Sequence, residues 1–514
     1  MIKIFKKIKG APLALKASIA YTLCSIIQKS IGFITMPLFT SLLTTEQYGQ
    51  YTIYASWSSI FMILITLNLA YGSFGHAMIK YEGKREEYVS SIQSLVFLFA
   101  LAFVGIYLPF SSFFNSFLEL PTSVMLLMAG EILFTFGFQC WLGIQRYKFK
   151  YWPAVIMTIL VSTLCPILAF ILIKNMDEKG IARIIGFAAI NIFFGLLIFV
   201  YNLIKGKKLF SKEYWAFALK FNLPLLAYYF SQVIFNQSDR IMIQKLCDDG
   251  LSKAAVYGVG YTIALILTFV LTAINNSYIP WLYGKIKDKD IYKNRSMAII
   301  ITIIMCTLIG GVIWISPELV RVMAGKAYME AIWVIPPVSI SLILLLFTQF
   351  STNIEFYYAE KYKLIIASIG AAALNIGLNF WLIPIYGYLV AGYTTLASYV
   401  VFAVGNYFAI FKHLKKGGEL HGLYNLPALL IIFVLFVGLA YLGVLLYNYP
   451  IARYVSIGVV IILLLIFSKK IYKFCKKLIS KDIIKTEKEE QEEVTSLKED
   501  NVPIEPQAIG EENE

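Results

Sequence analysis

Long apolar segments follow one another along most of the chain. A helix that crosses a bilayer needs about 20 predominantly apolar residues, and about fourteen segments meet that length. They cover residues 18–43, 49–71, 90–110, 122–144, 152–173, 183–204, 219–245, 255–281, 297–316, 331–356, 363–384, 389–411, 426–447 and 451–468. They lack the strict alternation of barrel strands, so each segment is predicted to be a helix. The sequence therefore predicts an all-α integral membrane protein.

Composition supports this prediction. The chain is 59% hydrophobic and only 15% charged, and its mean hydropathy is +0.71, whereas soluble proteins are roughly 25% charged. There is too little polar surface for a water-exposed shell. The net charge of +14 is attributed to membrane loops, and no nucleic-acid partner is expected.

The positive charges of the loops predict the orientation. With a cytoplasmic N-terminus, six inner loops carry about 20 basic residues and seven outer loops carry about eight. The outer ones are Lys174, Lys179, Arg183, Lys245, Lys253, Arg321, Lys326 and Arg453. Because basic residues favour cytoplasmic loops, we expect a multi-pass protein of the cell membrane with both termini cytoplasmic.

Two short motifs recur at nearly constant spacing. YGQYTI begins at Tyr48 and YGVGYTI at Tyr257, while QRYK begins at Gln145 and EKYK at Glu360. The offsets are about 209 and 215 residues, which indicates an internal repeat of the kind that transporters contain. We predict two pseudo-symmetric six-helix lobes with a cavity between them, followed by two extra C-terminal helices. The predicted boundaries are residues 1–212 for the N-lobe, 213–418 for the C-lobe, 419–468 for helices 13 and 14, and 469–514 for a disordered cytoplasmic tail.

Several polar residues lie inside predicted spans, where they are costly and usually face a bundle interior or a wet cavity. Gln232, Asn236 and Arg240 are spaced i, i+4, i+8 and share one helix face. Ser25 and Lys29 share a face of the first span, with Lys29 near its middle. All five are candidate substrate-binding residues that line a path for an anionic substrate. The alternative for Lys29 is an ion pair that serves packing alone.

Three acidic residues within spans are candidates for ion coupling or gating. Glu131 is interpreted either as the partner of Lys29 or as a proton or cation site. Asp239 is interpreted as a local ion pair with Arg240 or as an outer gate. Glu355 lies near the inner end of its span, where an interfacial position is the alternative. Asn375 and Asn379 are expected to form interhelical hydrogen bonds.

The sequence contains no recognised catalytic signature. It has no GxxxxGK[ST] nucleotide-binding loop, no HExxH and no G-x-S-x-G. Its cysteines and histidines show no metal-site spacing. We expect no catalytic residues, no metal and no cofactor, with a proton or sodium gradient as the candidate energy source.

Four runs of residues resemble bacterial polysaccharide and oligosaccharide flippases of the multidrug/oligosaccharidyl-lipid/polysaccharide exporter superfamily. They are GFITMPLFTSLLTTEQYGQYTIY from Gly32; Leu223-Pro224 with DRIMI from Asp239; AAVYGV from Ala254 with PWLY from Pro280; and NIGLN from Asn375 with IPIYG from Ile383 and Ala391-Gly392. The resemblance covers roughly residues 14–415. It carries over one site motif, Asp239-Arg240.

The resemblance implies a non-enzymatic flippase. Such a protein moves undecaprenyl-diphosphate-linked oligosaccharide repeat units from the inner to the outer leaflet by alternating access, for O-antigen, capsule or exopolysaccharide assembly. The lipid bilayer, a polysaccharide polymerase and chain-length machinery are the implied partners. A multidrug cation antiporter, a lipid II flippase and a membrane polysaccharide polymerase are the alternatives.

Overall fold

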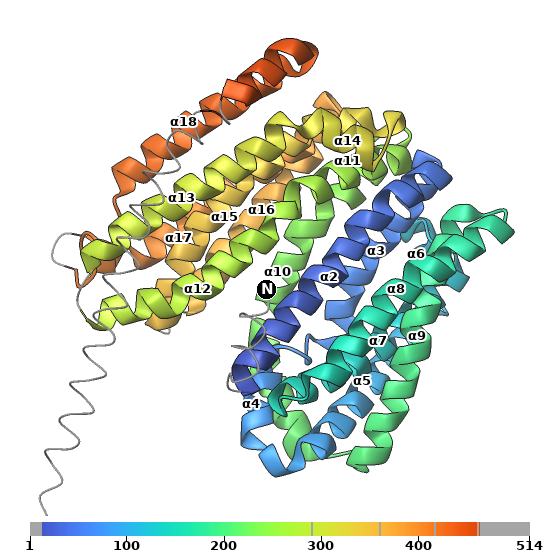
Figure 1. Ribbon diagram of the computed structural model, residues 1–514. Coiled ribbons are helices and arrows are strands. Elements are labelled where there is room, and N and C mark those ends of the chain that lie inside the picture. Colours follow the sequence, from blue (N-terminus) through green and yellow to red (C-terminus); the bar gives the residue numbers. More distant parts are fainter. Residues whose placement is uncertain (1–12, 289–290, 359–360, 416–417, 460–461, 463–514) are drawn as a thin grey trace, which may run out of the picture. The chain divides into compact units, whose positions relative to one another are not determined.

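The computed structural model describes residues 13–288, 291–358, 361–415, 418–459 and 462, all of them in helices or their connections (Figure 1). The first half contains α2 (Leu13–Leu42), α3 (Thr45–Thr66), α4 (Gly72–Lys80), η1 (Glu82–Lys84), α5 (Arg85–Tyr107), α6 (Ser111–Leu118), α7 (Thr122–Tyr147), α8 (Tyr151–Asn175) and α9 (Lys179–Gly206). The second half contains α10 (Lys212–Leu246), α11 (Gly250–Ala264), η2 (Leu265–Leu267), α12 (Thr268–Lys287), α13 (Ile291–Trp314), α14 (Ser316–Met323), η3 (Lys326–Trp333), α15 (Ile335–Tyr357), α16 (Lys361–Tyr386) and α17 (Val390–Leu414). The prediction of an all-α integral membrane protein is confirmed.

The thirteen predicted spans up to residue 447 each coincide with long helical segments, the last of them with α18 (Leu426–Leu445) and η4 (Leu446–Asn448). Eleven of the described segments are long and apolar enough to cross a membrane. The helices α3 and α10 are equally long, but they are more polar and fall outside these eleven. The second part of the predicted span 451–468, residues 460–461 and 463–468, and the tail from residue 469 lie outside the described residues.

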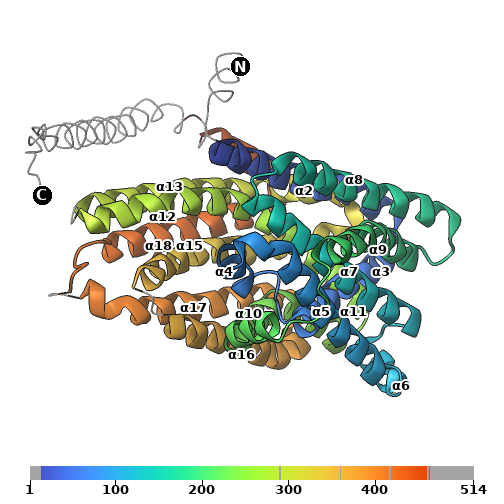
Figure 2. The ribbon, with the colours of Figure 1, turned by 90° about the horizontal axis from the view of Figure 1, so that it is seen from below.

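The predicted repeat appears as a repeated packing pattern. In the first half α2 packs on α8, α5 on α7, α7 on α9 and α8 on α9. In the second half the corresponding pairs also pack, α10 on α16, α13 on α15, α15 on α17 and α16 on α17. Figures 1 and 2 show α2 beside α8 and α16 beside α17. The N-lobe and the C-lobe are therefore built alike, while their residue boundaries stay predictions.

The repeated Tyr-Gly motif lies where the lobes meet. Gly49 on α3 faces α11 so closely that an added Cβ would be 2.1 Å from the carbonyl oxygen of Leu251. Gly258 on α11 faces α3, and its Cβ would be 3.0 Å from Cγ2 of Thr52. Small residues let helices approach closely in membranes. Each copy of the motif therefore provides a glycine at which the helix of the other lobe packs closely.

The helix α10 contacts both lobes. In its first turns Trp215 donates from Nε1 to the carbonyl oxygen of Ser91 over 2.9 Å. Further along, the hydroxyl groups of Ser231 and Ser368 in α16 are 2.9 Å apart. The first turns of α10 therefore pack on the N-lobe, and its later turns belong to the C-lobe.

Asn222 secures the first half of α10. It is fully buried, accepts from the backbone N–H of Ser73 over 2.9 Å, and donates to the carbonyl oxygens of Leu67 and Asn68 over 3.1 and 3.0 Å. Leu67 and Asn68 have positive φ angles of 46° and 54°, which are unfavourable for residues other than glycine. Asn222 thus stabilises a strained bend at the end of α3.

We predict that Asn222→Ala lowers the free energy of unfolding by about 1–3 kcal/mol, because it leaves buried backbone groups without partners. Thermal unfolding of the purified protein measures this. The control is Asn175→Ala, since Asn175 is exposed and its side chain donates only to Ile171 one turn earlier. Equal melting temperatures for the two variants would contradict the role given to Asn222.

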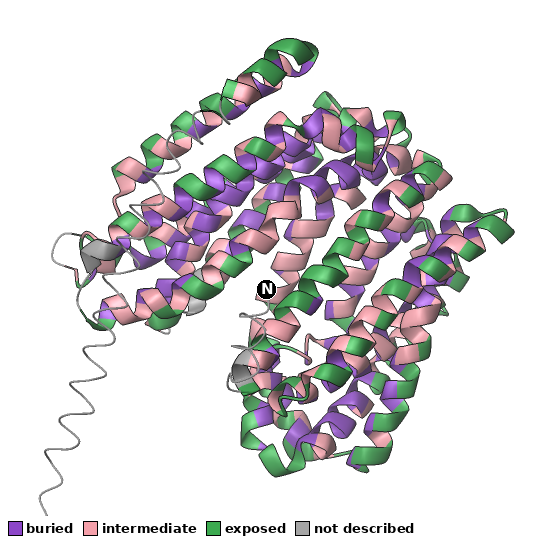
Figure 3. Ribbon diagram, in the orientation of Figure 1, coloured by how far each residue is buried: buried purple, intermediate pink, exposed green. Residues whose placement is uncertain are grey.

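Burial varies strongly between helices (Figure 3). Most residues of α15 are buried, whereas α18 buries only four of its described residues. Residues Leu445–Glu514 form a unit of their own, in which the described part comprises η4 and a helical stretch over residues 450–459. The core that positions the site therefore lies within the first unit, up to Val444.

Candidate functional site

A polar cavity of about 210 Å³ lies between the lobes. We call it the inter-lobe cavity. It is lined by residues of α3 between Tyr48 and Ser59, by Gln237 and Arg240 of α10, and by Gly258 and Thr262 of α11. We name the two sides of the molecule inner and outer according to the prediction from the loop charges, and this orientation stays a prediction.

Arg240 supplies the positive charge of this cavity. Its Nη1 donates to Oε1 of Gln237 over 2.7 Å, and its guanidinium carbon lies 4.6 Å from the centre of the Tyr261 ring. Gln237 Oε1 also accepts from the Ser56 hydroxyl of α3 over 3.1 Å. Arg240 thus joins a hydrogen-bond chain that crosses from one lobe to the other.

Asp239, the neighbour of Arg240, points into the C-lobe core. It is 1% exposed and accepts hydrogen bonds from Tyr257, Asn379 and Thr395 over 2.5, 2.6 and 2.7 Å. Consecutive residues of a helix do not face each other, and these two side chains, both within the described residues, form no ion pair. The predicted alternative of a local Asp239–Arg240 pair is therefore wrong.

The asparagines of α16 link helices, as predicted. Asn375 accepts from Ser238 of α10 over 3.0 Å and donates to Thr395 of α17 over 3.4 Å. Asn379 donates to Asp239 and accepts from the Thr394 hydroxyl. The carboxylate of Asp239 therefore lies among oxygen and amide groups drawn from α10, α11, α16 and α17.

Gln232 and Asn236 do not line the inter-lobe cavity. Gln232 donates to Ser368 of α16 over 2.6 Å, and Asn236 donates to the backbone of Gln232 and accepts from Tyr261 over 3.3 Å. The shared helix face is present, but the structure gives these two amides partners inside the C-lobe. Their proposed contact with substrate stays a prediction.

Lys29 contacts the C-lobe at a different depth from the inter-lobe cavity. Its Nζ lies 4.1 Å from the centre of the Phe269 ring of α12, and Ser25 lies one turn away on the same exposed face. Phe269 follows Thr262 by seven residues, roughly 10 Å along a helix. Lys29 and Arg240 therefore occupy two depths along the same lobe boundary rather than one pocket.

An apolar cavity begins beside Phe269. It measures about 420 Å³ and is lined by α12 and α13, from Val270 to Trp281 and by Met297 and Ile301. The lobe boundary therefore presents two cationic groups, and an apolar hollow lies within the C-lobe on the helix α12 that Lys29 contacts.

Glu131 has partners within the N-lobe. Its carboxylate accepts from Tyr54 of α3 over 2.5 Å and from Asn191 of α9 over 2.7 Å. Because Lys29 and Glu131 form no ion pair and Lys29 lies over Phe269, the pairing of these two residues is not observed. Each lobe thus holds a carboxylate bonded to a tyrosine of corresponding helices, Tyr54 of α3 and Tyr257 of α11.

Glu355 is 1% exposed and lies two residues before the end of α15, so its interfacial alternative and its coupling role stay predictions. Within the described ranges, no three His, Cys, Asp or Glu side chains are grouped so that they could hold a metal ion. The eight predicted site residues therefore lie in several separate regions of the protein and do not make up a single site.

Sequence reasoning missed Arg183, which was assigned to an outer loop. It lies in α9, is 6% exposed, and its guanidinium carbon is 3.9 Å from the Tyr51 ring, 4.3 Å from Tyr48 and 4.5 Å from Phe39. Tyr48 and Tyr51 also line the inter-lobe cavity, so Arg183 packs against two of the residues that line it. Its position one turn into an apolar segment was the available signal.

The outer ends of the lobes contact each other directly. Thr40 donates to the carbonyl oxygen of Met323 over 3.2 Å, and Thr45 donates to Ser252 over 3.1 Å. The rings of Tyr48 and Tyr328 meet edge to face at 5.7 Å. Together with the close approach of Gly49 to Leu251, these contacts join the two lobes at the end that the loop charges predict to be the outer one.

Comparison with known proteins identifies the family. The family model described as "Polysaccharide biosynthesis protein" matches residues 14–284. The chain belongs to this family. Two relatives of this chain occur in Haemophilus influenzae. "Lsg locus putative protein 1" is 25% identical, and the match covers 59% of this chain and 74% of the relative. An "Uncharacterized membrane protein" is 24% identical, and the match covers 71% of this chain and 89% of the relative.

Solved structures share the fold of this chain. "Lipid II flippase MurJ, inward closed conformation" has a TM-score of 0.65 at 17% identity and covers 89% of this chain and 99% of its own. An inward-facing multidrug resistance MATE family transporter of the MOP superfamily has a TM-score of 0.58 at 15% identity, and it covers 76% of this chain and 94% of its own. The family match confirms the resemblance to bacterial polysaccharide proteins, and these two structures show that the chain shares their fold.

Proposed function

We propose that this protein moves undecaprenyl-diphosphate-linked oligosaccharide repeat units from the inner to the outer leaflet of a bacterial cell membrane by alternating access. The inter-lobe cavity with Arg240 is the observation that carries the proposal. A guanidinium group is suited to phosphate oxygens because it donates in a planar fork.

Lys29 and the apolar hollow support an amphiphilic substrate. A diphosphate and its sugars cannot cross hydrocarbon unless polar groups replace their water. Arg240 and Lys29 would contact the diphosphate at successive depths, and the cavity of α12 and α13 would accept part of the polyprenyl chain. The unit delivered to the outer leaflet would then reach a polymerase and its chain-length machinery during O-antigen or capsule assembly.

Deletion of the gene tests the proposal in the cell. We expect surface polysaccharide to disappear and its lipid-linked unit to accumulate in the inner leaflet. Unchanged polysaccharide with an altered drug susceptibility would favour a multidrug antiporter. Accumulation of lipid II would favour a lipid II flippase, and accumulation of single repeat units in the outer leaflet would favour a polymerase.

We further propose that Glu131 and Asp239 couple transport to a proton or sodium gradient. Carboxylates inside membrane proteins commonly serve as proton relays, and oxygen-rich sites suit hard cations. Glu131 of α7 and Asp239 of α10 lie on helices that do not correspond in the repeat, but each accepts a hydrogen bond from a tyrosine of the corresponding helices α3 and α11.

We predict that Asp239→Asn or Glu131→Gln abolishes the stimulation of transport by an imposed gradient, because each removes a charge at nearly constant volume. Transport in vesicles with and without a proton or sodium gradient measures this. The control is Glu178→Gln, an exposed carboxylate beside α9. If both variants keep the full stimulation, the coupling role of these two residues is wrong.

A further inference from the structure

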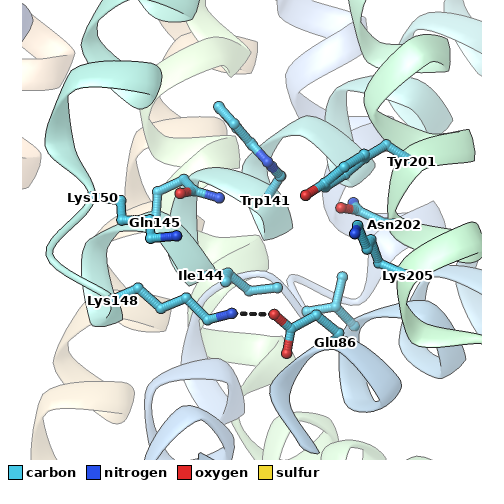
Figure 4. Close-up of a pocket in the computed structure, with 10 residues that line it drawn as sticks. Glu86, Trp141, Ile144, Gln145, Lys148, Lys150, Tyr201, Asn202 and Lys205 are labelled. Atoms are coloured by element: carbon cyan, nitrogen blue, oxygen red, sulfur yellow. Dashed lines mark hydrogen bonds and ion pairs between the residues drawn. The ribbon is translucent and has the colours of Figure 1, made fainter.

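A basic pocket lies at the inner end of the N-lobe, between α5, α7 and α9 (Figure 4). Its lining includes Glu86, Trp141, Lys148, Lys150 and Lys205, and its volume is about 90 Å³. Pockets for drug-sized ligands measure roughly 300–1,000 Å³. The space is therefore sized for one small polar group and not for an oligosaccharide.

The pocket carries an excess of positive charge. Lys148 forms an ion pair with Glu86 and donates a hydrogen bond to it, which neutralises one of the three lysines. Lys150 and Lys205 are exposed, and neither forms an ion pair with another described residue. Figure 4 shows Lys148 and Lys150 on one side and Lys205 on the other. Two ammonium groups thus remain for an anion.

Tyr201, which is 47% exposed beside the lysines, gives the pocket the composition typical of the depth of lipid headgroups. Trp141 and Tyr201 belong to its lining, and Nζ of Lys205 lies 5.9 Å from the centre of the Tyr201 ring, one helical turn away. Trp and Tyr favour the membrane–water interface, and Lys side chains extend from there to the surface.

An exposed apolar stripe leads from the pocket along α9. Phe193, Leu197, Val200 and Ile204 are each at least 44% exposed, and their spacing of four, three and four residues places them on one helix face. In a membrane this face contacts acyl chains. The pocket and the stripe together match a charged headgroup with its chains attached.

We propose that the basic pocket binds the phosphate headgroup of an anionic phospholipid, with the acyl chains lying along the stripe of α9. Basic pockets between transmembrane helices on the cytoplasmic side are suited to such headgroups. The pocket lies in the N-lobe alone and is separate from the inter-lobe cavity, so this inference does not depend on the transported substrate.

Thermal unfolding of the full-length protein in mixed micelles tests the proposal. We expect phosphatidylglycerol to raise the melting temperature and phosphatidylcholine to leave it unchanged. The double variant Lys150→Gln/Lys205→Gln should bind phosphatidylglycerol about 30-fold more weakly, the change expected for the loss of two basic residues at a membrane surface. The control variant Lys84→Gln/Lys415→Gln removes the same charge from exposed inner-side positions and should keep the full shift.

Three results would overturn the proposal. The first is an undiminished shift in the double variant. The second is an equal shift with phosphatidylcholine, which would show that the headgroup charge is not recognised. The third is an equal shift with inorganic phosphate alone, which would show that the pocket takes a free anion rather than a lipid.

Discussion

Arg240→Ala should reduce transport of the lipid-linked glycan roughly 10- to 150-fold, because a hydrogen bond to a charged group contributes about 1.5–3 kcal/mol. Arg240 brings both a charge and a planar set of donors to the inter-lobe cavity. Arg240→Lys keeps the charge but not the fork, so its transport rate should lie between those of wild type and Arg240→Ala. Export of surface polysaccharide at equal membrane protein levels measures all three.

Arg321→Ala is the matched control, since Arg321 is an exposed arginine of α14 outside the cavity lining, and it should export normally. Lys29→Ala should have a smaller effect than Arg240→Ala, because the Lys29 side chain is more exposed and exposed charges interact more weakly. Normal export by Arg240→Ala would refute the role of a cationic cavity.

Gly49→Ala should disfavour closure of the outer end. The new methyl group would lie 2.1 Å from the carbonyl oxygen of Leu251, and backbone cannot move aside as a flexible side chain can. Overpacking of this kind costs about 1–3 kcal/mol, which shifts the closed-to-open ratio by about 5- to 150-fold.

Accessibility of a cysteine in the cavity measures that shift. A reporter Thr262→Cys should react faster with a membrane-impermeant thiol reagent from the outer side when Gly49→Ala is also present. Gly32→Ala is the control, because an added Cβ there meets no atom within 4 Å. Equal labelling in both backgrounds would show that the α3–α11 contact does not close the cavity.

The helices and the repeat were predictable because both depend on local sequence. Segment length and apolarity identify most of the membrane helices, whereas α10 was located from its length although it is too polar to fall among the eleven apolar segments. The repeated Tyr48-Gly49 and Tyr257-Gly258 pairs indicated two lobes, and in the structure they lie at the lobe boundary. Local spacing likewise predicted the interhelical bonds of Asn375 and Asn379.

The partners of single polar residues were less predictable, because tertiary packing decides them. Gln232 shares a helix face with Arg240, yet its amide donates a hydrogen bond to Ser368 of α16. Arg183 resembled a loop residue, but three aromatic rings from α2 and α3 surround it. The Asp239–Arg240 pair could have been rejected from sequence, since neighbouring side chains diverge around a helix.

Reconstitution tests the central claim most directly. The purified protein is placed in liposomes with a fluorescent undecaprenyl-diphosphate oligosaccharide, and an impermeant glycosidase reports how much of the sugar reaches the outer leaflet. We predict rapid exposure of the sugar with the wild-type protein, and exposure near the protein-free rate with Arg240→Ala. Equal rates for wild-type and empty liposomes under proton and sodium gradients of either direction would contradict the proposed function.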